Sequence, residues 1–249
     1  MQYETLKLRR QKETDDRPDV IYALLKDYII NGTNIPGERL NIVELADVLK
    51  VSLTPVREAL IRLTSERLVT SVPNKGFFLK SPLLEELLQL HELATVVLGT
   101  CAGKQPQASI RGQMQAWKQQ FETMSGQTAR LGTDTDLTGT MEALWLAIAA
   151  LGGNLEFREI IQNFNDRTHF ITILEVDDPE IREALSSHLT RLLDAMIEGG
   201  STRDAVHEIF ALKTSALPRL VMESLARSFG IAHASGRPFQ AASLRPKVA

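Results

Sequence analysis

The first part of the chain carries short stripes of apolar residues at helical spacing, separated by polar breaks. Between Pro18 and Asn31 the apolar residues recur every three or four positions, which predicts a helix. Asn31 and Gly32 are residue types that end helices, so we expect this helix to stop there. The residues that form its stripe are Val20, Ile21, Leu24, Leu25, Tyr28 and Ile29.

Two more helices are predicted after a turn at residues 35–37. Asn41 precedes the first and has Glu44 three positions later, a spacing at which each side chain can bond a free backbone N–H of the first turn. The second is expected to begin with Thr54 as N-cap and Pro55 at the first helical position, where the missing N–H costs nothing. The inward-facing residues of these two helices are expected to be Ile42, Leu45, Ala46, Leu49, Val56, Ala59, Leu60 and Leu63.

A hairpin is predicted directly after the third helix. Residues 68–72 and 77–80 have the composition of strands, and the turn-forming cluster Pro73-Asn74-Lys75-Gly76 lies between them. Two helices joined by a short break and followed by a hairpin form a winged helix-turn-helix, which presents the N-terminal residues of its second helix to the major groove of DNA. Residues 18–80 are therefore predicted to be a DNA-binding domain with Lys75 at the tip of its wing.

The pattern changes at Ser81 and Pro82, after which no strand alternation is found. The fold class predicted is mainly α, a winged helix-turn-helix followed by an all-helical bundle of about six helices, with a kink at Pro218. The helices are expected at residues 83–101, 107–124, 138–151, 155–176, 179–198 and 202–229. The predicted domains are a flexible arm at 1–17, the DNA-binding domain at 18–80, a helical effector-binding and dimerisation domain at 81–228, and a flexible tail at 229–249.

Composition sets broad limits on the kind of protein. Of the 249 residues, 43% are hydrophobic and 24% charged, which is typical of a folded globular chain. No run approaches the ~20 apolar residues of a membrane helix and the N-terminus is polar, so we expect a cytoplasmic protein without membrane contact. Cys101 is the single cysteine, which excludes an internal disulfide and a CxxC motif and predicts a buried thiol.

The net charge of −3 hides an uneven distribution. Residues 1–80 contain 13 Lys and Arg against 11 Asp and Glu, whereas residues 81–249 contain 15 against 20. Because affinity for DNA depends on clustered basic residues, this small excess permits DNA binding without demonstrating it. An architectural DNA binder would carry a much larger basic excess.

Side chains at the start of the third helix are the candidate DNA contacts. The hydroxyls of Ser52 and Thr54, with the free N–H groups of the helix terminus, suit phosphate oxygens. The guanidinium of Arg57 can bridge O6 and N7 of guanine, so Arg57 is assigned to base readout. For Arg62, as for other cations of this domain, contact with DNA and a solvated helix surface remain alternatives.

Four segments of the N-terminal domain carry a resemblance to a known family, namely Pro36-Gly37-Glu38-Arg39-Leu40, Leu45-Ala46, Val51 to Leu60, and Pro73-Asn74-Lys75-Gly76-Phe77. With them the domain resembles the GntR family of bacterial regulators. The resemblance implies that Ser52, Leu53, Thr54 and Arg57 contact an operator, and that Asn74, Lys75 and Gly76 belong to the wing. Leu53 stands where many members carry an arginine, so one base contact of the family is expected to be missing.

The helical domain resembles the FCD effector domain of the FadR-type subfamily, most closely at residues 144–155. That domain commonly binds a metal through one aspartate and three histidines, which complete a pocket for a small organic acid. Here Met141 and Trp145 fall where the aspartate and the first histidine are expected, and His188 lies one residue from the second. Too few ligands remain for a divalent ion, so no metal and no cofactor are expected.

Two alternatives follow for the helical domain. It binds an effector that is less acidic or more hydrophobic, or its pocket is closed and the domain serves only to dimerise. His91 either lines the effector cavity or is a hydrogen-bonded core histidine. The candidate effector-binding residues are His91, Met141, Trp145, Asn154, Arg167 and His188.

The function expected is that of a sequence-specific transcription regulator, a repressor whose operator affinity responds to a small-molecule effector. One such domain reads few base pairs, so a homodimer on a palindromic double-stranded DNA operator is expected. An enzyme is not expected, because no GxSxG, HExxH, P-loop or GxGxxG motif occurs in a suitable context.

Overall fold

The computed structural model describes residue 6 and residues 18–32, 36–104, 108–125 and 137–235. The chain divides into two compact units. The first comprises Met1–Leu83 and Glu223–Ala249, and the second comprises Leu84–Met222. Most of the predicted arm at 1–17 and the predicted tail from residue 236 onward lie outside the described residues. Leu6, the one described residue of the arm, is fully buried in the core of the first unit.

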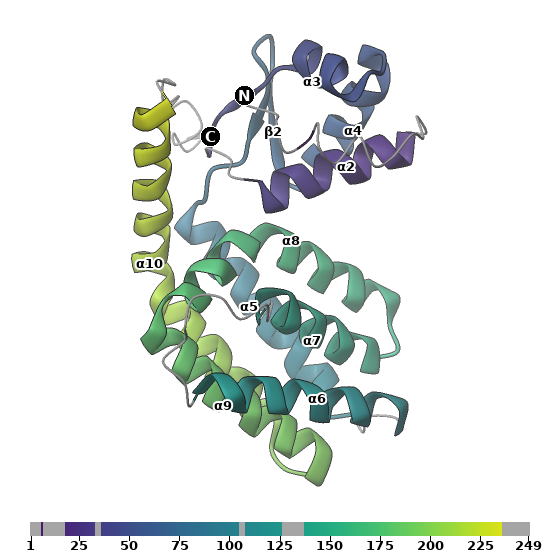
Figure 1. The fold of residues 1–249 in the computed structure, drawn as a ribbon. Coiled ribbons are helices and arrows are strands. Elements are labelled where there is room, and N and C mark those ends of the chain that lie inside the picture. Colours follow the sequence, from purple (N-terminus) through teal and green to yellow (C-terminus); the bar gives the residue numbers. More distant parts are fainter. Residues whose placement is uncertain (1–5, 7–17, 33–35, 105–107, 126–136, 236–249) are drawn as a thin grey trace. The chain divides into compact units, whose positions relative to one another are not determined.

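The first unit is a winged helix (Figure 1). Its sheet has the order β1-β3-β2 with antiparallel pairing throughout. The hairpin was predicted, but β1 was not, because two residues are too few for an alternating pattern. Arg39 and Leu40 of β1 pair with Phe78 and Phe77 of β3. The elements are α2 (Pro18–Asn31), β1 (Arg39–Leu40), α3 (Ile42–Leu49), α4 (Leu53–Ser65), β2 (Val69–Val72) and β3 (Gly76–Leu79).

The starts of α3 and α4 differ in how their backbone N–H groups are satisfied. The side chain of Asn41 accepts hydrogen bonds from the backbone N–H groups of Val43 and Glu44, which confirms the predicted cap of α3. The predicted N-cap of α4, Thr54, is wrong, because Ser52 has the extended N-cap conformation and the helix begins at Leu53. Proline is tolerated throughout the first turn, where N–H groups lack an intrahelical acceptor, so Pro55 alone could not fix the first residue.

The apolar stripes of the three helices converge on one core. α2 and α4 pack against each other along their apolar faces, and α3 packs against α4. The inward-facing residues predicted for α4 are all buried. The core is completed from the hairpin, and its buried members are Leu6, Ile21, Leu24, Leu25, Tyr28, Leu40, Leu45, Ala46, Leu49, Val56, Ala59, Leu60, Leu63, Leu68, Val69, Phe77 and Leu79.

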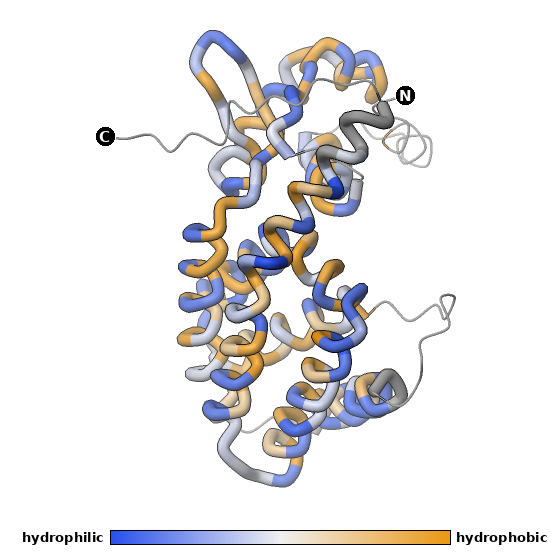
Figure 2. Tube along the Cα trace, turned by 90° about the vertical axis from the view of Figure 1, so that its left-hand side faces the viewer, coloured by the Kyte–Doolittle hydropathy of each residue, from blue (hydrophilic) through white to orange (hydrophobic). Residues whose placement is uncertain are grey.

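Within its described residues the second unit consists of helices joined by turns and contains no strand, as predicted. α6 packs along α9, α7 against α8, and α5 against both α7 and α8. Figure 2 shows apolar and polar residues alternating around these helices, which is the pattern of a bundle with one buried face per helix. The helices are α5 (Leu84–Ala102), α6 (Ala108–Ser125), α7 (Leu137–Leu151), α8 (Leu155–Asp177), α9 (Pro179–Glu198) and α10 (Thr202–Ser235). The residues of α10 up to Met222 belong to the second unit, and those from Glu223 onward belong to the first.

The last helix is longer than predicted. α10 includes Pro218 and continues to Ser235 rather than ending at Phe229. Gly230 did not stop it, because a single glycine weakens a helix by only about 1 kcal/mol relative to alanine. Within the described residues no helix combines the length and the apolar character that a bilayer crossing requires.

Gly152 follows α7 at a point where the backbone approaches two side chains. A Cβ at this position would lie 2.7 Å from the Sγ of Cys101 and 2.8 Å from Cδ2 of Phe157. Cys101 is buried, as predicted, and burial raises the pKa of its thiol, so the group stays protonated and packs as a small apolar side chain. The junction between α7 and α8 therefore depends on the missing Cβ of Gly152.

We predict that Gly152→Ala destabilises the helical unit by about 1–3 kcal/mol, the usual cost of an added carbon in a packed core. Gly112→Ala is the matched control, because Gly112 lies exposed within α6 and a Cβ there would meet nothing within 4 Å. The control should stabilise the unit by about 0.5–1 kcal/mol. Urea unfolding followed by tryptophan fluorescence measures both, since Trp117 and Trp145 both lie in the helical unit. Equal stabilities of the two variants would contradict the close approach at Gly152.

Candidate nucleic-acid interface

The N-terminus of α4 lacks a side-chain cap. Ser52 is the N-cap residue, but its side chain makes no capping hydrogen bond, and the first turn contains no acidic residue. The N-terminus of α3 differs, because Asn41 caps it and Glu44 lies in its first turn. Free backbone N–H groups and the positive end of the helix dipole favour an anion, so the start of α4 suits a DNA phosphate.

The outer face of α4 carries the residues predicted to contact DNA. Thr54 and Arg57 are exposed there, on the side opposite the core residues Val56 and Leu60. Among the described residues Arg57 has no hydrogen-bond or ion-pair partner, so its guanidinium is available to an external ligand. Because it lies in the first turns of the helix, it can reach a base edge while the helix terminus contacts the backbone.

The tip of the wing is a tight turn that holds Lys75 outward. The backbone N–H of Lys75 donates to the carbonyl of Val72 at 3.0 Å, and Asn74 and Gly76 have positive φ angles of 61° and 98°. Positive φ favours glycine and is tolerated by asparagine, which explains these two residue types in the turn. The tip is hydrophilic (Figure 2), and the side chains of Asn74 and Lys75 are exposed.

A basic residue that we did not single out in the sequence lies beside the wing. Nε of Arg39 is 3.8 Å from where a Cβ on Gly76 would be. Arg39 is exposed at the edge of the sheet and, within the described part of the chain, has no ion-pair partner. The pairing of β1 with β3 places it there, and two residues of sequence do not predict that pairing. Arg39 and Lys75 therefore give the wing two cations.

Arg62, another predicted DNA contact, is engaged within the unit. Its guanidinium lies 3.6 Å from the ring centroid of Tyr22, and its nitrogens lie 3.3 Å from an Asp19 carboxylate oxygen and 3.7 Å from one of Glu66. Tyr22 donates to Glu66 at 2.5 Å and Lys26 pairs with it at 2.9 Å. Burial, followed by the hydrogen bond to Glu66, raises the pKa of Tyr22. These contacts join α2 to α4.

Three of the predicted effector-binding residues lie in the core of the helical unit. His91, Met141 and Trp145 are almost completely buried. The His91 ring lies 5.2 Å from that of Phe164 and 5.9 Å from that of Phe210, and the Trp145 ring lies 5.5 Å from that of Phe210. The structure therefore brings His91 and Trp145, from α5 and α7, against one aromatic residue of α10.

His91 is a neutral core histidine with one unsatisfied nitrogen. Its Nδ1 lies 2.8 Å from the carbonyl oxygen of Leu87, so Nδ1 carries the proton and donates. Burial, with a smaller contribution from the charge of Lys213, lowers the pKa of His91 to about 3. Nε2 then presents a lone pair, and among the described residues it has no partner.

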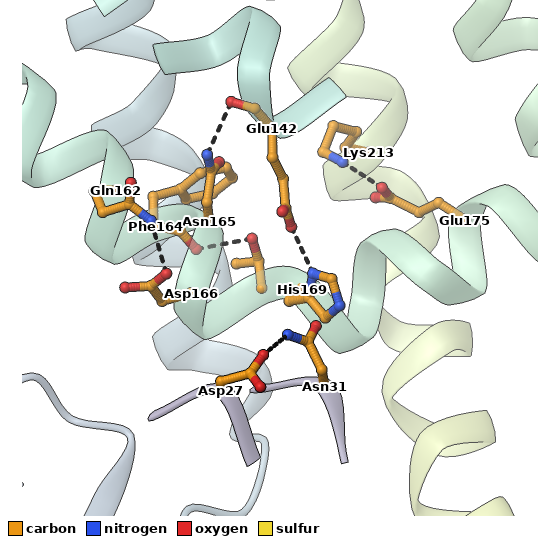
Figure 3. Close-up of polar contacts among 11 residues, drawn as sticks. Asp27, Asn31, Glu142, Gln162, Phe164, Asn165, Asp166, His169, Glu175 and Lys213 are labelled. Carbon is orange, nitrogen blue, oxygen red and sulfur yellow. Dashed lines mark hydrogen bonds and ion pairs between the residues drawn. The ribbon is translucent and has the colours of Figure 1, made fainter. Parts of the chain in front are cut away.

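Other polar side chains of the helical unit are buried or partly buried and contact one another between helices (Figure 3). Lys213 of α10 forms an ion pair with Glu175 of α8, and both side chains are fully buried. Burial raises the pKa of Glu175 although Lys213 opposes this, and its second oxygen, Oε1, lacks a partner within the described residues. Asn165 donates to the backbone carbonyl of Glu142 at 3.0 Å, while the Glu142 carboxylate lies 2.8 Å from Nδ1 of His169.

The remaining predicted effector residues have other contacts. Asn154 is exposed and caps α8 by accepting from the N–H of Glu156. His188 is partly exposed, 3.4 Å from Glu208, and Arg167 forms an ion pair with Glu86. The sequence did not reveal the Lys213–Glu175 pair, because its partners are far apart along the chain. Across the described residues no three His, Cys, Asp or Glu side chains are grouped so that they could hold a metal ion.

We predict that protonation of His91 destabilises the helical unit in acid. The unfolded chain binds a proton below the ordinary pKa of 6.5, whereas the folded chain resists it until about pH 3. As the pH is lowered from 6 to 4, the free energy of unfolding of the natural chain should therefore decrease by about 1.4 kcal/mol per pH unit more than that of His91→Gln. The variant has no titrating group at this position. Urea unfolding at each pH, read by tryptophan fluorescence, measures this difference. Parallel pH profiles would contradict the buried neutral histidine.

Comparison with known proteins agrees with this geometry. A family model described as "Bacterial regulatory proteins, gntR family" matches residues 18–79, the winged helix. The Nta operon transcriptional regulator of Aminobacter aminovorans is 32% identical over 165 residues, which are 64% of this chain and 74% of that protein. The HTH-type transcriptional repressor GlaR of Escherichia coli K12 is 39% identical over 71 residues, which are 28% of this chain and 32% of that protein.

The fold extends beyond the winged helix in the similar structures. E. coli McbR/YncC has 21% sequence identity and a TM-score of 0.64, with 81% of this chain and 97% of that chain covered. The curated relatives are transcription regulators and not enzymes, and the same holds for this chain. With its helix-turn-helix, its wing and its match to a regulator along most of that protein's length, the chain belongs to the gntR family of bacterial regulatory proteins.

Proposed function

We propose that this regulator binds a palindromic double-stranded DNA operator as a homodimer and reads it with the N-terminal residues of α4. The observation that carries the proposal is Arg57, which is exposed on the outer face of α4 and has no partner within the described residues. Ser52 and Thr54 are assigned to phosphate at the same helix end, and the wing residues Lys75 and Arg39 to the flanking backbone.

Arg62 receives a different role in this proposal from that expected from the sequence. Its contacts with Tyr22 and Asp19 of α2 hold α4 in place. We therefore assign Arg62 to positioning the recognition helix. A homodimer remains part of the proposal because one winged helix reads few base pairs, and two related by a twofold axis match the two halves of a palindrome.

The proposal includes control of operator affinity by a small molecule bound in an FCD-type helical unit. Three buried acceptor atoms without partners support an internal polar site, namely Nε2 of His91, Oδ1 of Asn165 and Oε1 of Glu175. Because the buried cation Lys213 is already paired with Glu175, the interior is balanced in charge and favours an effector of low net charge that donates hydrogen bonds. The effector would shift the dimer between forms that bind the operator well and poorly.

The alternative is a dimeric regulator whose closed helical unit binds no ligand. Thermal unfolding of the full chain with neutral polyols, amines and organic acids separates the two proposals. A compound that raises the melting temperature and changes operator affinity supports effector control. Repression is proposed because GlaR, which is similar to this chain over 71 residues, is named a repressor.

Arg57→Ala should lose about 1–3 kcal/mol of binding free energy on the operator, because a bidentate contact with guanine is removed. Arg158→Ala is the matched control: it removes the same charge from an exposed position on α8 in the helical unit. Fluorescence anisotropy at physiological salt measures both affinities. A folded Arg57→Ala variant that binds the operator as tightly as Arg158→Ala would refute the assignment.

We expect that neither the addition of zinc nor the removal of metal ions with EDTA changes the melting temperature of the full chain. The reason is chemical: Met141 and Trp145, which replace the ligands of the related domains, offer no donor that zinc binds well. Differential scanning fluorimetry with stepwise zinc addition after EDTA treatment is the measurement. A zinc-dependent rise of several degrees would show that the helical unit holds a metal after all.

A further inference from the structure

The recognition helix exposes a large aliphatic side chain at the end that faces DNA. Leu53 is the first residue of α4, and 48% of its surface is exposed. It does not belong to the core, which α4 joins through Val56, Leu60 and other residues of its inner face. An apolar residue at an otherwise polar helix end is left in water unless a ligand covers it.

Leu53 lies one helical turn before Arg57, and both are exposed. Four residues of α-helix rise about 6 Å, which corresponds to about two base-pair steps of B-DNA. A helix that brings Arg57 to a base edge therefore brings Leu53 to the edge of a base pair within two steps of it. At that position the side chain of Leu53 can accept no hydrogen bond and donate none.

The C5 methyl of thymine is the largest apolar group that the major groove presents. The other groups on the base edges there are hydrogen-bond donors or acceptors, which an aliphatic side chain would desolvate without compensation, and small C–H groups that offer little apolar surface. We propose that Leu53 is a specificity-determining residue that packs against a thymine methyl within two base pairs of the guanine contacted by Arg57. The inference rests on the proposed function and names the base that one residue selects.

Replacing thymine by uracil removes this methyl and leaves the hydrogen-bonding pattern of the base pair unchanged. The thymines of the operator are replaced by uracil one position at a time, in both half-sites together. We expect the affinity of the full chain to fall at one symmetric position. The expected loss is about fourfold for each half-site, the value for one methyl group buried against an apolar surface. Fluorescence anisotropy competition with the unmodified operator measures it.

Leu53→Ala should bind the thymine operator more weakly than the natural chain and should be insensitive to uracil at that position. Leu155→Ala is the matched control, because Leu155 is also an exposed leucine at the first position of a helix, in the helical unit. It should keep the full uracil effect. Circular dichroism checks the fold of both variants, and the uracil series with the natural chain needs no variant at all.

The outcomes separate this inference from the function on which it rests. A chain that binds random DNA as tightly as any selected sequence would overturn the proposed function and this inference with it. A chain that binds one operator specifically, but at which no thymine responds to uracil, would overturn the inference alone. So would a Leu53→Ala variant that keeps the uracil effect of the natural chain.

Discussion

The DNA-binding unit depends on the attachment of α4 by one face. Its inner residues, among them Val56 and Leu63, are buried against α2 and α3, and each buried aliphatic side chain of this size contributes about 1.5–3 kcal/mol. At the edge of this contact Arg62 stacks on Tyr22. Because these interactions use the inner face alone, the outer face with Leu53 and Arg57 stays free, and the helix that carries it is held rigidly.

The contrast between elements that support the core and the helix that is left free for DNA also explains why α3 and α4 are capped differently. α3 is an internal support, and Asn41 satisfies its first N–H groups from within the chain. The side chain of Ser52, at the start of α4, bonds none of the N–H groups there. A helix end left in this state is satisfied by water or by an anion, and on DNA the anion is a phosphate.

Periodicity predicted the helices well because each buries one face. The bounds of α2 and α9 agree with the predicted ends, since proline at the start and Asn-Gly or Gly-Gly at the end mark them in the sequence. Short or non-local features were not predictable. The strand β1 exists because β3 pairs with it, and Arg39 reaches the wing only through that pairing.

Contacts in the interior of the helical unit were likewise not predictable from the sequence. Substitutions such as Trp145 suggested an apolar pocket, and that residue is buried among aromatic rings. The sequence did not reveal that Lys213 and Glu175 meet there, 38 residues apart along the chain, nor that His91 would keep an unpaired nitrogen. The packing of different helices brings such groups together, and no local sequence pattern predicts these contacts.

The central claim is that two copies of α4 read the two halves of one palindrome. Genome-wide footprinting of the purified full chain at physiological salt tests it most directly. We predict a small set of protected sites, each a palindrome whose half-site centres lie one helical turn of DNA apart, about 10 base pairs, or a multiple of that spacing. Protection spread evenly over genomic DNA, or sites without twofold symmetry, would contradict the account.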